Sequence, residues 1–176
     1  TYDKLFSEYH HTVAQLLITG ADTQNAHRHQ NFTNTLNRLL QLGALPIINE
    51  NDTVATDEIV IGDNDTLAAI VAQSVHADLL ILLSDIDGLY TADPHTHPDA
   101  VLLHKVTKID DAVRELAGVS STKQGTGGMV TKLRCAEICL SCGCDMVIAN
   151  GSNPDNLYAI LDGKQIGTTF TTEESV

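Results

Sequence analysis

Positive charge is scarce in this sequence. Only 10 of the 176 residues are Lys or Arg, against 23 Asp or Glu, and the formal net charge at pH 7 is -13. Proteins that bind nucleic acids usually present a basic face to the phosphate backbone, so the composition argues against a nucleic-acid partner. The same negative field repels anionic ligands at long range. Any phosphate site must therefore rely on local hydrogen-bond donors and cations.

Long apolar stretches are also absent. The longest strand-like run, at residues 79–83, is far shorter than the roughly 20 apolar residues that span a bilayer. The first residues do not combine positive charge with a following apolar stretch, as a secretory signal does. With 43% hydrophobic residues, the composition is that of an ordinary globular domain. We therefore expect a single cytoplasmic domain with no membrane partner.

The usual cysteine pairs of a zinc site are missing as well. The four cysteines lie close together at positions 135, 139, 142 and 144, and this spacing does not form two separated pairs. Cys135 and Cys139 fall on a predicted helix, where thiols pack as small apolar side chains. We therefore expect free thiols and no metal site, which suits a reducing compartment.

What the sequence does contain is an alternation of apolar strands and amphipathic helices. This alternation predicts an α/β fold, a three-layer αβα sandwich on a mainly parallel sheet. The chain opens inside a helix without a preceding buried strand, so we expect residues 1–176 to be the C-terminal part of one domain whose first strands are missing. The predicted strands are residues 13–18, 45–48, 79–83, 146–149 and 166–170, and the predicted helices are residues 27–42, 110–117 and 153–161 with two more beginning near residues 65 and 129.

A glycine-rich turn precedes one of these helices. Residues 125–132 read Gly-Thr-Gly-Gly-Met-Val-Thr-Lys. Glycines let the backbone approach a ligand closely, and the helix that follows directs unpaired N–H groups at it. Lys132 stands about one turn inside the helix, near Lys123 and Arg134, so positive charge gathers here in an otherwise acidic chain. The spacing is not that of a Walker A motif. A turn that merely starts a helix is the alternative to a phosphate site.

Polar residues follow two further predicted elements. Asn-Glu-Asn-Asp at residues 49–52 follows a buried strand, and Gly-Asp-Asn-Asp at residues 62–65 starts a helix. Ligands of open parallel sheets bind beyond the carboxyl ends of the strands. Carboxylates there suit an ammonium group and side-chain amides suit a carboxylate, as an amino acid requires. Helix capping explains one of these side chains, but not the whole set.

A third segment follows the central strand. Residues 84–94 read Ser-Asp-Ile-Asp-Gly-Leu-Tyr-Thr-Ala-Asp-Pro, and their place at the carboxyl end of the strand suits contacts with a nucleotide. A loop built from turn-forming residues explains the local composition equally well.

Taken in this order, residues 46–52, 62–65, 84–94 and 125–132 resemble the amino-acid kinase family, and within it the branch that acts on glutamate. The similarity runs from near the first residue to Phe170. Each motif alone is moderately specific, whereas the ordered set is highly specific. The resemblance implies an amino-acid kinase fold and ATP-dependent phosphorylation of the γ-carboxylate of L-glutamate to γ-glutamyl phosphate, the first step of proline biosynthesis.

The resemblance also implies residue roles on the side of the amino acid. Asn49, Asp52 and Asn64 would hold glutamate. Asp65 would orient the catalytic lysines. Proline is the implied feedback inhibitor, competing near the glutamate site, and we expect a homo-oligomer.

On the nucleotide side, the resemblance assigns Ser84 and Asp85 to contacts with ATP. Lys132 would stabilise the transferring phosphoryl group. The family uses Mg2+ with ATP, and the metal is held mainly by the nucleotide. The implied phosphate cradle consists of Thr126, Gly127, Gly128, Met129, Val130, Thr131 and Lys132.

Two departures from the family pattern limit the expected activity. The opening strand with its lysine-containing phosphate loop is not in this sequence, and neither is the early Ser-Gly segment that helps to hold glutamate. Phosphoryl transfer needs several donors at once, so we expect the chain by itself to be inactive. Two alternatives are a non-catalytic module that binds glutamate or proline and a kinase of the same family that acts on another carboxylate or on carbamate.

Overall fold

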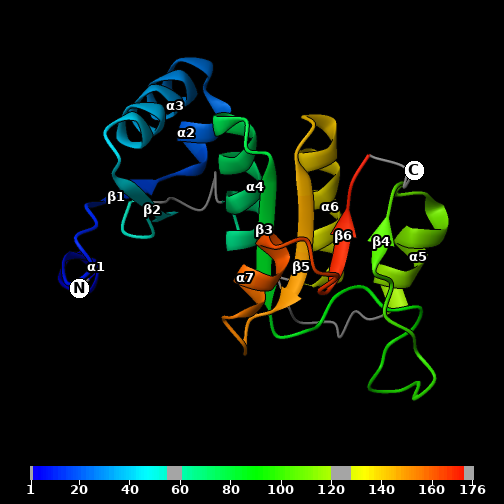
Figure 1. Cartoon of the computed structure of the whole chain (residues 1–176). Helices are drawn as coiled ribbons and strands as arrows, with labels where there is room; N and C mark the ends of the chain where they lie inside the picture. Colours follow the sequence, from blue (N-terminus) through cyan, green and yellow to red (C-terminus); the bar gives the residue numbers. More distant parts are fainter. Residues whose placement is uncertain (1, 55–60, 120–127, 173–176) are drawn as a thin grey trace. The chain divides into compact units, whose positions relative to one another are not determined.

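The computed structural model describes residues 2–54, 61–119 and 128–172. The described chain divides into two compact units, Thr1–Leu67 and Ala68–Val176, and the boundary falls within helix α4 (Asn64–Val75) (Figure 1). None of the helices in the described ranges is both long and apolar enough to cross a membrane.

The first unit is a pair of parallel strands with helices. β1 and β2 run in register from Val13 opposite Leu45 to Ile18 opposite Glu50. Both strands were predicted, and β2 extends two residues further than expected, to include Asn49 and Glu50. The elements of this unit are α1 (Tyr2–Ser7), β1 (Val13–Ile18), α2 (Gly20–Gln24), α3 (Ala26–Gln41) and β2 (Leu45–Glu50), followed by the start of α4.

The longest helix of this unit, α3, has a clear beginning, inner face and end. The Asn25 side chain accepts a hydrogen bond from the amide of Arg28 and so caps its first turn. Phe32 and Leu36, which lie four residues apart on one face of the helix, are buried, whereas Leu40 is 48% exposed. Gly43 has a φ of 70°, a left-handed conformation that ends the helix at low cost.

The second unit contains a four-stranded sheet in the order β3–β5–β6–β4. β3 pairs with β5 in parallel and β4 with β6 in parallel, whereas β5 and β6 are antiparallel. The α/β class with mainly parallel pairing is therefore confirmed. The unit consists of the rest of α4, then β3 (Leu79–Ser84), β4 (Lys105–Val106), α5 (Asp111–Val119), α6 (Met129–Ser141), β5 (Asp145–Asn150), α7 (Asn156–Leu161) and β6 (Thr168–Phe170).

Strand β5 has helices on both of its faces. Met146 and Ile148 point into a core that is filled by residues of α4, α5 and α6. Val147 and Ala149 point to the other face, where Ile160 of α7 covers them. Alternate residues of a strand point to opposite faces, so the second unit has the predicted αβα layering (Figure 1).

A tight turn before β6 fixes the loop that follows β3. Gly167 has a φ of 68°, and a Cβ atom there would lie 2.0 Å from the carbonyl oxygen of Ile148. Only glycine fits such an approach. Beside it, the fully buried Thr168 hydroxyl accepts a hydrogen bond from the amide of Leu89 at 2.8 Å and donates one to the carbonyl of Leu103 at 2.5 Å. Both ends of the long loop between β3 and β4 are thereby tied to the sheet.

Candidate functional site

In the first unit, the carboxyl ends of β1 and β2 lie at the same edge because the strands are parallel. The amide of Asn51 donates to the carbonyl of Ile18 at 2.7 Å, which extends the pairing by one bond. Asn49, near the end of β2, and Asp52, just beyond it, are both exposed. These two predicted glutamate ligands are therefore open to solvent at the expected edge.

Glu50 joins the two polar motifs of this unit. Its Oε1 atom accepts a hydrogen bond from the amide of Ile61 at 2.9 Å. The bond brings the segment after β2 next to the segment that begins α4, although residues 55–60 between them lie outside the described ranges. Sequence reasoning assigned no role to Glu50. Its position inside the motif, at the end of a predicted strand, was the available signal.

The start of α4 contains a helix-capping residue next to a candidate glutamate ligand, Asn64, and a candidate catalytic residue, Asp65. Asp63 accepts a hydrogen bond from the amide of Thr66 at 2.7 Å and another from its hydroxyl at 2.9 Å. Asp63 is therefore the helix cap that was left open as an alternative. Asn64 is exposed and Asp65 is half-buried.

In the second unit, Ser84 and Asp85 lie at the carboxyl end of β3. The Ser84 hydroxyl donates to Asp85 Oδ1 at 3.0 Å. Ser84 stands opposite Asn150, the last residue of β5, and its carbonyl accepts a hydrogen bond from the amide of Gly151 at 2.8 Å. The two parallel strands thus end together, at the kind of edge where parallel sheets bind ligands.

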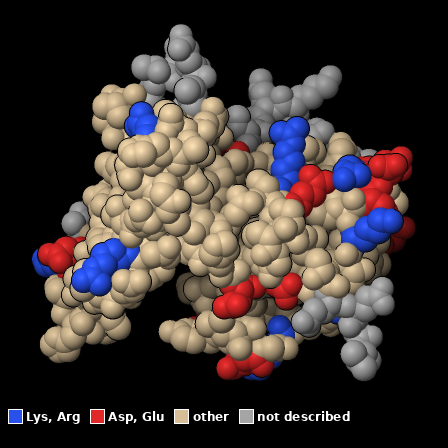
Figure 2. All heavy atoms as spheres, turned by 90° about the horizontal axis from the view of Figure 1, so that it is seen from above, with Lys and Arg blue, Asp and Glu red and all other residues tan. Residues whose placement is uncertain are grey.

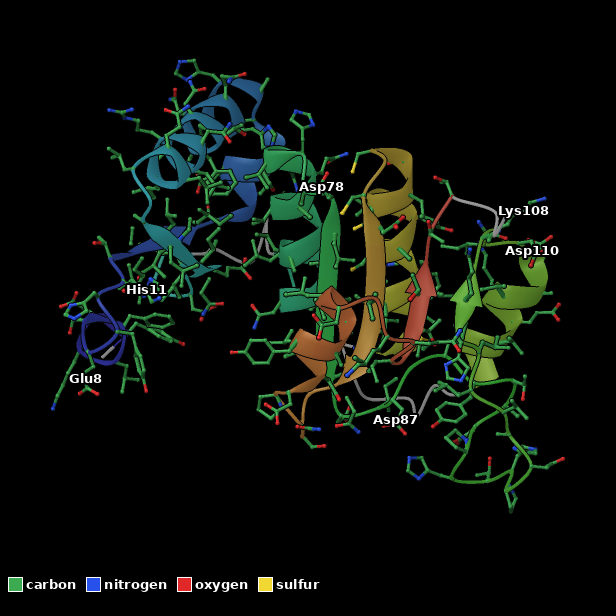
Figure 3. All side chains as sticks on the ribbon, in the orientation of Figure 1. Glu8, His11, Asp78, Asp87, Lys108 and Asp110 are labelled. Atoms are coloured by element: carbon green, nitrogen blue, oxygen red, sulfur yellow. The ribbon has the colours of Figure 1, made fainter. Side chains whose placement is uncertain are left out.

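Asp87 lies at this edge and links three segments. Figure 3 shows it at the opposite end of the sheet from Asp78, which precedes β3. Asp87 Oδ1 accepts a hydrogen bond from Asn150 Nδ2 at 2.8 Å, and Oδ2 accepts one from the Tyr90 hydroxyl at 2.9 Å. Burial and the neighbouring carboxylate raise the pKa of Tyr90 above its ordinary value. Sequence reasoning did not single out Asp87 or Asn150, although Asn150 directly follows a predicted strand.

The described part of the glycine-rich segment begins at Gly128, which is the N-cap of α6. Gly128 has no side chain to accept from the first-turn amides, but its carbonyl accepts a hydrogen bond from the amide of Thr131 at 3.0 Å and one from the amide of Lys132 at 3.3 Å. Lys132 lies in the second turn and is buried, with 6% of its surface exposed. The positions of Thr126 and Gly127 lie outside the described residues. Met129, Val130 and Thr131 form the first turn of α6, as expected.

The four cysteines are free thiols in the core or at its border. Burial, followed by the neighbouring thiols, raises the pKa of Cys139 well above its ordinary value, so this sulfur is protonated at neutral pH. Among the described residues there is no group of three or more His, Cys, Asp or Glu side chains that is positioned to hold a metal ion.

Each unit gathers its own set of predicted residues. The first unit contains Asn49, Asp52, Asn64 and Asp65, and the second contains Ser84, Asp85 and the residues of α6 up to Lys132.

On the face drawn in Figure 2, the Lys and Arg side chains stand singly or beside acidic ones and form no continuous basic surface.

Sequence comparison relates the chain to known kinases. A sequence model of the Amino acid kinase family matches residues 1–150. The chain is 52% identical over 169 residues to the glutamate 5-kinase of Caldanaerobacter subterraneus subsp. tengcongensis, covering 96% of this chain and 45% of that protein. It is 48% identical to the glutamate 5-kinase of Clostridium perfringens, covering 98% of this chain and 66% of that protein. The chain thus spans about half to two thirds of the length of these relatives.

Solved structures share the fold at low sequence identity. The product complex of T. acidophilum isopentenyl phosphate kinase matches with a TM-score of 0.65 and 21% identity, covering 95% of this chain and 63% of that one. UMP kinase from Ureaplasma parvum matches with a TM-score of 0.62 and 14% identity, covering 96% of this chain and 64% of that one. At these identities the likeness establishes the fold alone.

Proposed function

Because this chain belongs to the amino acid kinase family, we propose that it is the catalytic-domain part of a glutamate 5-kinase. The enzyme would transfer the γ-phosphoryl group of ATP to the side-chain carboxylate of L-glutamate. The observation that carries the proposal is the identity of about 50% to proteins named glutamate 5-kinase over nearly the whole chain. The product, γ-glutamyl phosphate, is the first intermediate of proline biosynthesis.

The amino acid would be held by the polar residues at the carboxyl edge of the first unit. Asp52, exposed just beyond β2, is a suitable partner for the α-ammonium group, and the amides of Asn49 and Asn64 are suitable donors to carboxylate oxygens. The Glu50–Ile61 hydrogen bond supports this assignment, because it keeps the two motifs next to each other. Asp65 would orient the catalytic lysines.

The nucleotide would be held by the second unit. Ser84 and Asp85 would contact ATP, and the segment from Thr126 to Lys132 would cradle its phosphates. Helix α6, 13 residues long with Gly128 as its N-cap, would contribute the partial positive charge of its N-terminus to binding the phosphates. Mg2+, bound mainly to the nucleotide, would supply further charge neutralisation when present.

The residues would act by alignment and by neutralising charge. The side-chain carboxylate of glutamate is already ionised at neutral pH and is a nucleophile, so the reaction needs no general base and no covalent enzyme intermediate. Lys132 and the amides of the glycine-rich segment would stabilise the charge that spreads over the transferring phosphoryl group. The burial of Lys132 strengthens such an interaction, because a charge acts more strongly where water is excluded.

The proposal also covers feedback inhibition, cellular location and oligomeric state. Proline, which shares the α-carboxylate and an α-nitrogen with glutamate, would compete at the amino-acid site as a feedback inhibitor. The enzyme would be cytoplasmic and a homo-oligomer. Neither a membrane nor a nucleic acid would be a partner.

The choice of substrate distinguishes the proposal from its neighbours. A kinase for an N-acylated amino acid or for carbamate would have no use for a carboxylate that pairs with a free ammonium. A non-catalytic module would bind glutamate or proline without turning over ATP. A hydroxamate assay with ATP, Mg2+ and hydroxylamine, run with glutamate, N-acetylglutamate and carbamate as separate acceptors, tests the proposal on the full-length protein that contains this chain. Glutamate-dependent product is expected, and product from another acceptor alone contradicts the proposal.

A further inference from the structure

We propose that Asn150 is a positioning residue for the nucleotide, because its side-chain amide holds Asp87 and thereby fixes the segment of residues 84–90. The inference rests on the proposed function, which assigns Ser84 and Asp85 of this segment to ATP. Asn150 itself would touch neither substrate nor nucleotide.

Asn150 is held from three directions. Its Nδ2 atom donates to Asp87 Oδ1 at 2.8 Å, and its Oδ1 atom accepts from the amide of Ser152 at 2.9 Å. Its main-chain carbonyl accepts from Asn156 Nδ2 at 3.0 Å. The side chain therefore has one defined rotamer and one defined assignment of its amide oxygen and nitrogen. Its Nδ2 atom is therefore a fixed donor to the loop that follows the neighbouring strand β3.

Asp87 passes this restraint to the loop. Its second oxygen accepts from the Tyr90 hydroxyl at 2.9 Å, so the carboxylate connects the end of β5 to two points of the segment. Two further hydrogen bonds hold the ends of the segment: the carbonyl of Ser84 accepts from the amide of Gly151, and the amide of Leu89 donates to the hydroxyl of Thr168. The Asp87–Asn150 bond holds the middle.

The location of the pair points to a role in binding rather than in folding. The Asp87–Asn150 bond is exposed, and exposed polar pairs contribute little to global stability. It lies at the carboxyl edge of a parallel sheet, where a ligand would be bound. Two donors also fix the direction of the Asp87 carboxylate, which would otherwise be free to turn toward the phosphates of an anionic ligand.

The side chains of Asp87 and Asn150 can be exchanged in a double variant. This exchange distinguishes a role in positioning the nucleotide from a role in stability alone. Asn150→Asp places two carboxylates face to face and removes the donor, at almost unchanged volume. Asp87→Asn combined with Asn150→Asp restores one donor and one acceptor with the direction of the bond reversed. Asn153→Asp is the matched control, because it adds the same charge three residues away and keeps the oxygen that accepts from the amide of Asp155.

The test measures ATP affinity by calorimetric titration, the KM values for ATP and glutamate, and thermal unfolding, all on the full-length protein. A hydrogen bond to a charged group contributes enough that we expect Asn150→Asp to weaken ATP binding about tenfold. The KM for glutamate is expected to stay within about twofold, since only binding of one substrate is affected. The swapped double variant is expected to recover most of the loss, and Asn153→Asp to bind ATP like the wild type.

Two results would overturn the inference. One is ATP affinity of Asn150→Asp equal to that of Asn153→Asp. The other is an equal loss in the single and the swapped variants, which would show that Asn150 does not act through Asp87. Failure of the wild type to phosphorylate glutamate, with the ATP titrations as expected, would instead remove the proposed substrate and leave the positioning role supported.

Discussion

The carboxylate of Asp63 accepts hydrogen bonds from both the amide and the hydroxyl of Thr66, at 2.7 and 2.9 Å. This pair caps helix α4 and so sets where Asn64 and Asp65 stand. An aspartate at this position also favours the N-terminal end of the helix dipole.

Replacing Asp63 with Ala is therefore expected to lower the free energy of unfolding by about 1 kcal/mol, as the loss of an N-cap usually does. Asp63→Ser, which keeps a capping oxygen, is the control and is expected to recover most of the loss. Chemical denaturation of both variants measures the difference. Equal stability of the Ala and Ser variants would show that the cap contributes nothing.

Asp52→Asn is expected to weaken glutamate binding and to leave ATP binding nearly intact. The substitution removes the charge that we assign to the α-ammonium group, and removal of one partner from a buried pair costs on the order of 3–5 kcal/mol. Because Asp52 is exposed in the free chain, such a loss requires that glutamate buries the pair on binding. Calorimetric titration with each ligand measures both effects. Equal losses for glutamate and ATP would indicate damage to the fold.

Lys132→Ala is expected to lower kcat far more than it raises the KM for glutamate. The loss of one preorganised donor to a developing negative charge typically costs about 10²–10³ in rate. Lys108→Ala, at an exposed position, is the control for the loss of one positive charge. Steady-state hydroxamate assays on the full-length protein measure both constants. A Lys132→Ala rate within a few-fold of the wild-type rate would remove this residue from the mechanism.

Thr168→Val is expected to lower the free energy of unfolding by about 2 kcal/mol, because it leaves the buried amide of Leu89 and the partly buried carbonyl of Leu103 unpaired. The two side chains have nearly the same volume, so packing is preserved. Thr168→Ser keeps the hydroxyl and is expected to be less destabilised than the Val variant. Denaturant titrations compare the three proteins, and a Val variant as stable as the wild type would show that water or rearrangement satisfies both groups.

Asp22 makes stability depend on pH in the acid range. Burial raises the pKa of this carboxyl, but hydrogen bonds from the amide and hydroxyl of Thr19 and the neighbouring Arg28 outweigh it, so the folded-state pKa lies below the ordinary 3.8. A carboxyl whose pKa is lower in the folded state stabilises the fold at pH values above its ordinary pKa. This contribution is lost as the pH falls through the folded-state pKa.

Asp22→Asn is therefore expected to destabilise the protein at pH 7 and to differ little from the wild type once the pH is well below the folded-state pKa. Asp99→Asn, at an exposed position, is the control. Urea titrations at neutral and strongly acidic pH measure the difference. A deficit of Asp22→Asn that is the same at both pH values would rule out the ionised carboxylate as its cause.

The sequence predicted the longer elements well, because their apolar residues repeat at the period of the secondary structure. β1 has the predicted bounds, and α3 differs by one residue at each end. Two short elements were not predicted. α2 depends on a local capping box between Thr19 and Asp22, and β4 has only two residues, too few to show a period.

The candidate site was predicted at the level of motifs but not of contacts. Helix capping was correctly offered as one role within residues 62–65, yet which of the acidic residues caps α4 depended on the bonds of Thr66. The pairing of Asp87 with Asn150 joins residues 63 positions apart. No local pattern encodes such a contact, because it depends on β3 and β5 ending side by side.

The order of strands in the second unit has a consequence for synthesis on the ribosome. β4 joins the sheet through β6, the last strand of the described chain, and not through β3, which precedes it. While residues 105–106 emerge, their partner at residues 168–170 has not yet been made, so β4 and the loop that precedes it must wait until those residues have been synthesised. Contacts between distant segments form late, and an unpaired strand in a nascent chain is open to wrong partners. This part of the molecule is therefore where premature termination or slow translation would do the most harm to folding.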